Sequence, residues 1–434
     1  MSAMKTQKLY VIAIGGIMTS GIARLYHSKG WEVAGSDAAQ SSVTDELAAE
    51  GITVHIGQKA ENIADDIDLV VYSVAVTPGS DGYAELEAAK GFGITCKSLD
   101  EVVSDLTREY FTISLAGVHG KSTTTAMTAK ILIDANMDPT VLVGTKMPEL
   151  NGRNVLVGES KYLVLEADDY ARKFTSYKSD IAVINNIEAE HLDFYGDEAA
   201  VVQAFADFVS GLADDGVLIA NGQDEKTMQL VRSLQLKPTQ KLHIFNEQEL
   251  AKHDLQVFGD FNMSNAEAAA AVARELGLTT EQIEKSLHSF AGTWRRQEKL
   301  ADNIYTDYAH HPTEIAAAIS GFKNAFADKR LIVVFQPHQA DRTKRLFEDF
   351  LHAFDMADET ILLPIYIVKG RDEGIEVSSE QLVDAMNSPK VHYEADFANA
   401  FARAKSAVDA GEAVALFMGA GTIDGMLRGA LKQV

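Results

Sequence analysis

Short apolar runs alternate with segments of helical periodicity along most of the chain. The runs occupy residues 8–14, 68–74, 110–117, 161–167, 181–187, 330–336 and 413–419. Each run precedes a segment in which apolar residues recur every three to four positions. This alternation is typical of parallel sheets whose strands are joined by crossover helices, so the pattern predicts the α/β class.

The length of the chain predicts several domains. At about 150 residues per domain, 434 residues correspond to about three. Polar connections near residues 108 and 296 separate the periodic blocks. We therefore expect domains at 1–107, 108–296 and 297–434.

Composition excludes several classes of protein. With 46% hydrophobic and 24% charged residues, the chain has the composition of a globular domain. No apolar run approaches the ~20 residues of a membrane span, and the apolar start lacks the small-residue cleavage site of a signal peptide. Cys96 is the only cysteine, which excludes an internal disulfide and a cysteine-based metal cluster. A reducing cytoplasm fits this composition.

The net charge of the chain limits the kinds of partner that it can bind. Lys and Arg number 39 against 63 Asp and Glu, giving a formal charge of -24 that repels a nucleic-acid backbone. A local basic pocket for one nucleotide remains compatible with this charge. We expect neither a nucleic-acid nor a membrane partner, and a monomer or weak homodimer.

Glycines lie between the first apolar run and the first helical segment. Gly15, Gly16 and Gly21 would let backbone N–H groups approach a diphosphate at a helix N-terminus. Asp37 follows the second predicted strand, where an acidic side chain commonly meets a ribose or base. From these residues alone, a diphosphate-binding loop and a plain tight turn are about equally supported.

A stronger signal follows the run at 110–117. Gly117, Gly120, Lys121 and Ser122 come after a predicted strand and open a helix. Such glycines let amides face phosphates, the lysine supplies a positive charge, and the hydroxyl can bind Mg2+. The loop is two residues shorter than the standard Walker spacing. The alternative is a Ser/Thr-capped helix with a solvated lysine.

Candidate metal ligands follow two later strands. Glu166 lies near the end of the run at 161–167. The run at 181–187 is followed by Glu188, Glu190, His191 and Asp193. Carboxylates suit Mg2+, whereas histidine is an unusual ligand for so hard an ion. His191 could instead be a hydrogen-bonded loop residue. The neighbouring aspartates 168 and 169 could equally supply charge to a helix N-terminus.

Two polar clusters lie in the last third of the chain. Each follows a predicted strand, and the clusters consist of Asp307, Tyr308, His310 and His311, and of His338 and Arg342. Ligands of open α/β sheets bind outside the carboxyl ends of the strands, where both clusters are expected. Adjacent residues in a turn point apart, which argues against a metal shared by the two neighbouring histidines.

Motifs along nearly the whole chain resemble those of the Mur ligase family. In order, they are "IGGIMTSGIA", "GVHGKSTTT", "EADD", "NIEAEHLDFYG", "FNMSNA", "GTWRRQE", "DYAHHPTEI" and "FQPHQADRTKRLFEDF". The resemblance implies a Rossmann-like N-terminal domain for a UDP-sugar, a central P-loop ATPase domain and a Rossmann-like C-terminal domain for an amino acid. Within the family, the chain most resembles the members that add L-alanine to UDP-N-acetylmuramate in peptidoglycan synthesis.

The resemblance also implies roles for individual residues. ATP and its Mg2+ (or Mn2+) would be bound by Gly117, Gly120, Lys121, Ser122, Thr123, Asn262, Arg296 and Asp307, with Ser122, Glu166 and His191 as the metal ligands. Asn262 matches an adenine contact, Arg296 a phosphate contact and Asp307 a ribose contact. The UDP-sugar and amino acid would be bound by Gly15, Gly16, Ser20, Asp37, Ser73, Tyr308, His310, His338 and Arg342. The catalytic set would be Lys121, Glu166, His191, His310, His338 and Arg342.

The implied reaction follows from charge. A carboxylate does not accept an amine, so ATP first converts it to an acyl phosphate, and the amine then displaces phosphate. His310 or His338 could take the proton from the amine. The alternatives are a murein-peptide ligase, which would join a recycled tripeptide to the same sugar nucleotide, and a non-catalytic nucleotide-binding regulator. Intact Lys121, Ser122, Glu166 and His191 argue against the regulator.

Three positions depart from the family pattern. Ala13 and Met18 replace two glycines, which affects the fit around the sugar nucleotide. Gln339 stands where the most similar members have a second arginine. A neutral amide binds a carboxylate more weakly than a guanidinium. We therefore expect a high KM for L-alanine, or a preference for another small amino acid.

Overall fold

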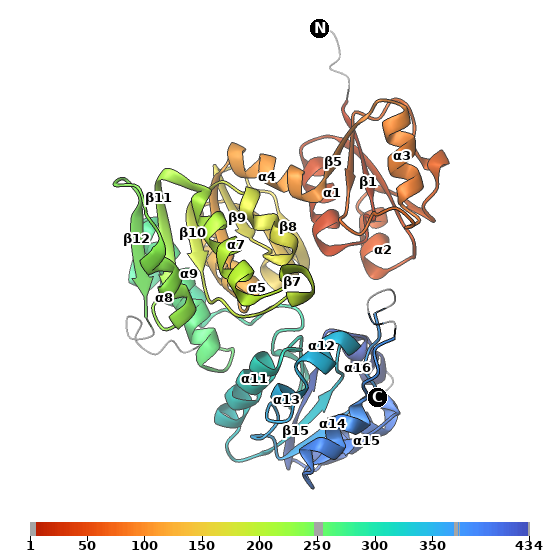
Figure 1. The fold of residues 1–434 in the computed structure, drawn as a ribbon, viewed down its shortest axis with the longest axis vertical. Coiled ribbons are helices and arrows are strands. Elements are labelled where there is room, and N and C mark those ends of the chain that lie inside the picture. The colour runs from red at the N-terminus through yellow and green to blue at the C-terminus, as the bar shows by residue number, and fades with distance from the viewer. Residues whose placement is uncertain (1–5, 247–254, 369–371, 373, 433–434) are drawn as a thin grey trace. The chain divides into compact units, whose positions relative to one another are not determined.

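The computed structural model describes residues 6–246, 255–368, 372 and 374–432. These residues form three sheets, of five, seven and six strands (Figure 1). By their contacts they fall into two compact units. Unit 1 comprises Met1–Ala251 and Ser264–Leu287, and unit 2 comprises Lys252–Met263 and His288–Val434.

The first sheet of unit 1 is parallel and has the strand order β3-β2-β1-β4-β5. Its strands are β1 (Lys8–Ile12), β2 (Glu32–Asp37), β3 (Thr53–Ile56), β4 (Leu69–Tyr72) and β5 (Thr95–Ser98). The helices are α1 (Ile17–Ser28), α2 (Ser42–Ala49), η1 (Ala60–Asn62), α3 (Tyr83–Gly91) and α4 (Leu99–Glu109). The strand order reverses beside β1, which is where ligands of such sheets bind.

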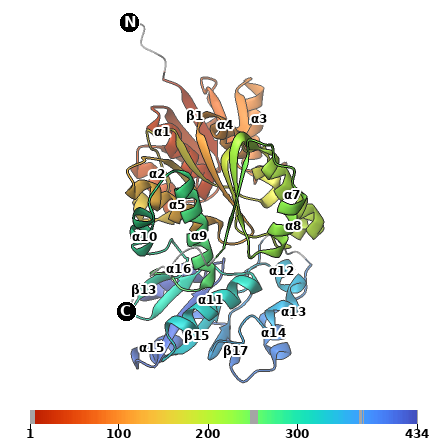
Figure 2. The same cartoon turned by 90° about the vertical axis from the view of Figure 1, so that its left-hand side faces the viewer.

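The second sheet of unit 1 has the order β12-β11-β10-β6-β9-β7-β8. The strands are β6 (Phe111–Ala116), β7 (Thr140–Met147), β8 (Arg153–Leu156), β9 (Tyr162–Glu166), β10 (Ser179–Ile184), β11 (Leu212–Asn221) and β12 (Lys241–Phe245). The helices are α5 (Lys121–Asp134), η2 (Pro148–Leu150), η3 (Tyr170–Ser176), α6 (Leu192–Tyr195), α7 (Glu198–Ser210), α8 (Glu225–Ser233), α9 (Asp260–Glu275) and α10 (Thr280–His288). Helix α5 lies on one side of the sheet, and α7 and α8 lie on the other (Figure 2).

The sheet of unit 2 has the order β13-β14-β18-β15-β16-β17. The strands are β13 (Glu298–Ala301), β14 (Ile304–Asp307), β15 (Arg330–Phe335), β16 (Glu359–Leu362), β17 (Val391–Tyr393) and β18 (Ala413–Met418). The helices are α11 (Pro312–Ala325), α12 (Ala340–Arg345), α13 (Phe347–Phe350), α14 (Ser379–Met386), α15 (Phe397–Asp409) and α16 (Ile423–Leu431). Separate apolar clusters bury the two faces, one including α11 and the other α15 and α16.

The predicted α/β class is confirmed, and each of the seven predicted apolar runs overlaps a strand. The strands of these runs that are neighbours in a sheet pair in parallel as expected, but the sheets are mixed, because β7–β8 and β13–β14, outside the runs, are antiparallel. Short connections join these pairs, and a short connection is compatible only with antiparallel neighbours. Within the described part of the chain, no helix has the length and apolar character required to traverse a bilayer.

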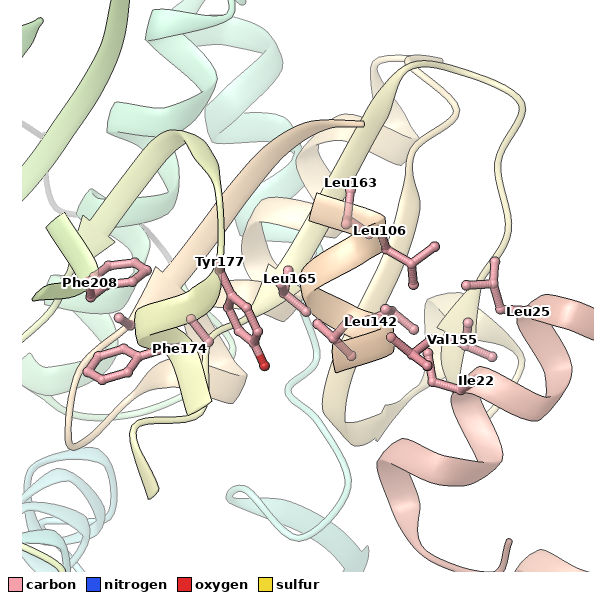
Figure 3. Close-up of a cluster of buried hydrophobic side chains, with 14 of the residues drawn as sticks. Ile22, Leu25, Leu106, Leu142, Val155, Leu163, Leu165, Phe174, Tyr177 and Phe208 are labelled. Atoms are coloured by element: carbon pink, nitrogen blue, oxygen red, sulfur yellow. The ribbon is translucent and has the colours of Figure 1, made fainter. Parts of the chain in front are cut away.

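The first and second sheets share a hydrophobic core within unit 1. Ile22 and Leu25 of α1 belong to the same buried cluster as Leu142 of β7 and Val155 of β8 (Figure 3). These four side chains are 5% exposed or less. Helix α1 therefore packs both on its own sheet and on the edge hairpin of the next.

Candidate functional site

The loop between β6 and α5 requires its glycines. Gly117 has a φ of 146° and Gly120 a φ of 80°, both unfavourable for other residues. A Cβ at Gly120 would lie 2.2 Å from Asn265 Oδ1, and one at Gly117 would lie 2.9 Å from Asn185 Cβ. The two glycines thus let the loop pass closely over buried asparagine side chains.

Those asparagines form a polar network beneath the loop. Thr124 Oγ1 donates to Asn265 Oδ1 at 3.1 Å and accepts from Asn185 Nδ2 at 2.8 Å. Asn185 and Asn265 are both buried. Asn265 lies within the motif "FNMSNA" and Asn185 in the apolar run at 181–187, but no local pattern indicates that the two side chains meet. Their side chains fix the first turn of α5 and with it the phosphate loop.

Lys121 is held by its own loop and by an aspartate. Its Nζ donates to the carbonyls of Gly117 at 2.7 Å and Val118 at 3.0 Å, and to Asp169 Oδ1 at 2.7 Å. Burial lowers the pKa of Lys121, but the charges of Asp169 and Asp168 outweigh it, so the net shift is upward. Lys121 is therefore positively charged, as a phosphate-binding lysine must be.

Asp169 has a role that the sequence did not reveal. It is 1% exposed, and its second oxygen, Oδ2, has no hydrogen-bond partner among the described residues. The expectation that both neighbouring aspartates serve a helix N-terminus fits only Asp168, which accepts from the amide of Tyr170 at 3.1 Å. Asp169 instead is the counter-ion of Lys121.

Glu166 and Ser122, predicted to share a site, are in direct contact. The Ser122 hydroxyl donates to Glu166 Oε1 at 2.9 Å, and the amide of Gly144 donates to Oε2 at 2.6 Å. A Cβ at Gly144 would lie 2.8 Å from the carboxylate, so glycine is needed for this approach. Burial raises the pKa of Glu166. A desolvated carboxylate beside a hydroxyl is a donor set that suits Mg2+.

His191 lies against the segment that follows Glu166. Its ring packs edge-on against Tyr170, with centroids 5.0 Å apart, and its φ is 54°. Glu188 contacts a different histidine, His119 of the phosphate loop, with 2.8 Å between Nε2 and Oε2. The sequence analysis did not propose His119. The role of His191 as a metal ligand stays a prediction.

In the glycine loop between β1 and α1, the predicted Asp37 makes a hydrogen bond to the backbone. The amide of Gly15 donates to Asp37 Oδ2 at 2.9 Å, and a Cβ at Gly15 would lie 2.8 Å from the same oxygen. Ala13 has a φ of 61°, in the left-handed region that favours glycine. The backbone at Ala13 is therefore one that glycine would adopt with less strain.

The two serines predicted to bind the UDP-sugar differ in environment. Ser73 follows β4, is partly exposed, and accepts from the amide of Ala75 at 3.3 Å. Ser20 is 1% exposed and donates its hydroxyl to the carbonyl of Ile17 at 2.7 Å. The side chain of Ser20 is thus used within α1 and is not presented at the surface of unit 1.

In unit 2, the residues predicted to bind adenosine are linked through Gln297. Asp307 accepts from the amides of Gln297 at 2.8 Å and Ala309 at 2.7 Å. The side-chain amides of Gln297 and Asn262 both donate to the carbonyl of Phe258. Burial raises the pKa of Asp307. Asn262 and Asp307 are 3% and 5% exposed, so in this structure they hold the loop together, and their contact with a nucleotide stays a prediction.

The predicted amino-acid residues of unit 2 lie close together. The ring of His310 packs edge-on against Tyr308, with centroids 5.2 Å apart, and lies 6.3 Å from the ring of His338. Arg342 Nη1 lies 3.4 Å from His338 Nδ1. The four side chains therefore form one cluster at the ends of β14 and β15, where the sequence had indicated two polar clusters, and their role in binding an amino acid stays a prediction.

Two residues that the sequence analysis missed extend this cluster. Tyr366 stacks on His338 with centroids 5.4 Å apart and an interplanar angle of 7°. The guanidinium of Arg295 lies 4.8 Å from the ring centroid of Tyr308, and that of Arg296 lies 5.1 Å from it. Such contacts join residues of different loops, and no local sequence pattern indicates them.

Gln339, the departure near this cluster, has an unusual backbone. Its φ is 73° and its ψ is 126°. Its amide donates to the carbonyl of Tyr366 at 2.9 Å, which secures the conformation. Strained residues of this kind concentrate at functional sites.

Three family descriptions match successive parts of the chain. Residues 8–111 match "Mur ligase family, catalytic domain", residues 115–273 match "Mur ligase middle domain", and residues 295–421 match "Mur ligase, glutamate ligase domain". Together these matches cover most of the sequence.

Individual relatives match over nearly the full length. The chain is 36% identical to a UDP-N-acetylmuramate–L-alanine ligase of Desulfosudis oleivorans, covering 97% of each chain. It is also 36% identical to a protein of the same name from Aquifex aeolicus, covering 99% of this chain and 98% of the relative.

Solved structures share the fold. A UDP-N-acetylmuramate-alanine ligase of Thermotoga maritima superposes with a TM-score of 0.78 at 24% identity, covering 98% of both chains. A murein peptide ligase of Psychrobacter arcticus superposes with a TM-score of 0.69 at 22% identity, again covering 98% of both. Because the sequence identities are below 25%, these two superpositions show that the chain shares the fold of these proteins and no more.

Proposed function

The chain belongs to the Mur ligase family, and we propose that it is an ATP-dependent ligase that joins L-alanine, or another small amino acid, to UDP-N-acetylmuramate in peptidoglycan precursor synthesis. The observation that carries the proposal is the direct contact of Ser122 with Glu166 beside the charged Lys121. The names of the full-length relatives support the choice of substrates.

The phosphate loop supports transfer of a phosphoryl group. Lys121, once released from Gly117, Val118 and Asp169, would neutralise charge on the transferred phosphate. The substrate carboxylate would attack this phosphate, giving ADP and an acyl phosphate. The asparagine network beneath the loop would keep the geometry fixed during transfer.

The residues beside the loop fit Mg2+. Glu166 and Ser122 supply a carboxylate and a hydroxyl oxygen, and Asp169 has a buried oxygen without a hydrogen-bond partner among the described residues. We assign Ser122 and Glu166 to the ion, with His191 as a further ligand implied by the family resemblance. When bound, the ion would neutralise negative charge on the phosphates.

The second half of the reaction needs a neutral amine, and the two histidines of unit 2 suit different tasks. His310 Nδ1 lies 3.0 Å from the carbonyl of Tyr308, so this nitrogen donates and Nε2 carries the lone pair of the neutral ring. Nδ1 of His338 faces the guanidinium of Arg342, which can only donate, so His338 carries its proton on Nε2. We therefore assign proton acceptance from the amine to His310.

Measurement of ADP release tests the proposal. The purified protein is supplied with ATP, Mg2+ and UDP-N-acetylmuramate, and with L-alanine, glycine, L-serine or the L-Ala-γ-D-Glu-diaminopimelate tripeptide in turn. We expect release with a small amino acid, and mass spectrometry of the sugar nucleotide to show the amide product. Release with the tripeptide alone would make the chain a murein-peptide ligase, and release with none would contradict ligase activity.

A further inference from the structure

The β7–β8 hairpin joins the two sites of unit 1. The hairpin comprises residues 140–156 and lies at the edge of the second sheet. Near its middle, the amide of Gly144 holds Glu166 at 2.6 Å. At its end, Asn154 of β8 donates from Nδ2 to the carbonyl of Ile17 at 2.6 Å. Ile17 is the first residue of α1, directly after Gly16.

The contact between Asn154 and α1 is buried and close. Asn154 is 2% exposed, and its Oδ1 accepts from Arg24 Nη1 at 3.3 Å. A Cβ at Gly21 would lie 2.8 Å from Asn154 Nδ2, so the helix approaches the strand at a position without a side chain. The side-chain amide of Asn154 therefore makes hydrogen bonds to α1 at two positions. These are Ile17, its first residue, and Arg24, two turns further along.

Ion pairs link the same helix to the hairpin through two glutamates, Glu46 of α2 and Glu50 at its end. Arg24 is 6% exposed and donates to Glu50 Oε2 at 2.8 Å and Glu46 Oε2 at 3.3 Å. The other oxygens of these glutamates face the hairpin, since Glu46 Oε1 accepts from Lys146 at 2.7 Å and Glu50 Oε1 lies 3.3 Å from Arg153 Nε. With the apolar contacts of Figure 3, the pairs of Arg24 and Lys146 limit movement of α1 relative to the second sheet, whereas the pair of the exposed Arg153 adds little.

We infer that Asn154 is a positioning residue for the glycine loop at Gly15 and Gly16, and that the β7–β8 hairpin sets the position of this loop relative to Glu166. The inference rests on the proposed function, in which the glycine loop binds the UDP-sugar and Glu166 serves the ATP site. Asn154 touches neither substrate in this account, because its amide acts through the carbonyl of Ile17.

The test separates the two hydrogen bonds of Asn154. Asn154→Asp keeps an oxygen for Arg24 but removes the donor to Ile17, whereas Asn154→Ala removes both partners. The control is Arg153→Ala, on the adjacent residue of the same strand, whose side chain is 47% exposed and whose ion pair contributes little. KM for UDP-N-acetylmuramate and for ATP is measured for each, together with hydrogen exchange of residues 15–24.

We expect Asn154→Asp to raise KM for UDP-N-acetylmuramate about tenfold, with KM for ATP changed less than about twofold. The carbonyl of Ile17 keeps the hydroxyl of Ser20 as a donor, but it loses the buried amide of Asn154 and faces a carboxylate oxygen in its place. Exchange of residues 15–24 should become faster, and Arg153→Ala should match the wild type in all three measurements. Equal changes in both KM values, or faster exchange with unchanged KM, would overturn the inference, because a merely structural contact gives those results.

Failure of the proposed function gives a different outcome. If the wild type neither binds nor converts UDP-N-acetylmuramate, the substrate assignment is wrong. The role of Asn154 in positioning α1 is then tested by hydrogen exchange alone. Faster hydrogen exchange of residues 15–24 in Asn154→Asp but not in Arg153→Ala would support this positioning role. Equal exchange in both variants would overturn it.

Discussion

Substitution of Gly120 by alanine tests how the phosphate loop is held. Gly120 has a φ of 80°, and its added Cβ would lie 2.2 Å from the Oδ1 of the buried Asn265. Gly411 also has a φ of 80°, but no atom lies within 4 Å of its added Cβ. The two positions therefore share a φ of 80°, and only at Gly120 would an added Cβ collide with a neighbouring atom.

The expected magnitudes follow from these two terms. Left-handed backbone costs an alanine about 1–2 kcal/mol, and reduced freedom of the unfolded chain returns about 0.4–1 kcal/mol, so Gly411→Ala should lose about 1 kcal/mol. Gly120→Ala must also displace the Asn265 amide from its 3.1 Å bond with Thr124, which adds about 1–3 kcal/mol. We expect a total of about 2–4 kcal/mol for Gly120→Ala.

The assay is unfolding in urea, monitored by hydrogen exchange so that unit 1 and unit 2 are measured separately. A double-mutant cycle isolates the collision, because Asn265→Ala removes the atom that the new Cβ meets. In that background, Gly120→Ala should cost no more than Gly411→Ala does alone. Equal losses for Gly120→Ala and Gly411→Ala in the wild-type background would refute the reasoning.

Four further predictions concern single residues. Ala13→Gly should stabilise the protein by about 0.5–1 kcal/mol in thermal unfolding, because it relieves the left-handed strain at φ 61°; a loss of stability would contradict this. Asp358→Asn should cost about 1 kcal/mol at pH 7, because Asp358 accepts from Lys323 and the amide of Leu331. Burial raises the pKa of Asp358, but these contacts lower it by more, so the net pKa lies below the ordinary value of 3.8. The stabilisation by Asp358 is therefore fully present above pH 3.8, and the difference in stability between the wild type and the variant should shrink as pH falls through the lowered pKa. A constant difference down to pH 3 would count against this reasoning. Lys121→Ala should abolish ADP release while hydrogen exchange of the core strands stays as in the wild type, and full activity would exclude the phosphate-loop assignment. Gln339→Arg should lower KM for L-alanine about ten- to hundredfold if a second cation is missing from the site, and an already micromolar KM in the wild type would show that another residue supplies it.

Local sequence patterns predicted the elements and the ends of several of them. The alternation of apolar runs and helical segments gave the α/β class, because burial on both faces of a parallel sheet requires continuous apolar strands. Pro312 occupies the first position of α11, which proline favours, and His311 with Glu314 forms the capping box at that end. The glycine spacing predicted a tight loop between β6 and α5, and the structure has such a loop there, with glycines at φ 146° and 80°, where glycine is strongly favoured.

Family resemblance added what periodicity could not. It grouped Ser122 with Glu166, which are 44 positions apart, and the structure brings their side chains to 2.9 Å. It also marked Ala13 as a departure from glycine, and the left-handed backbone at this position gives the physical reason. For Ser20, the buried hydroxyl bonded within α1 does not match the expected substrate contact.

Only the tertiary structure decided which distant residues meet. Asn154 and Ile17 are separated by 137 positions, Lys121 and Asp169 by 48, and Gly144 and Glu166 by 22. Side chains at such separations are brought together by strand order and by the antiparallel turn of β7–β8, and these depend on the packing of the whole unit. The sequence by itself therefore determined the elements and the chemical groups of the candidate site. Packing determined the partners of those groups, because a buried polar atom must find a partner wherever the fold places one.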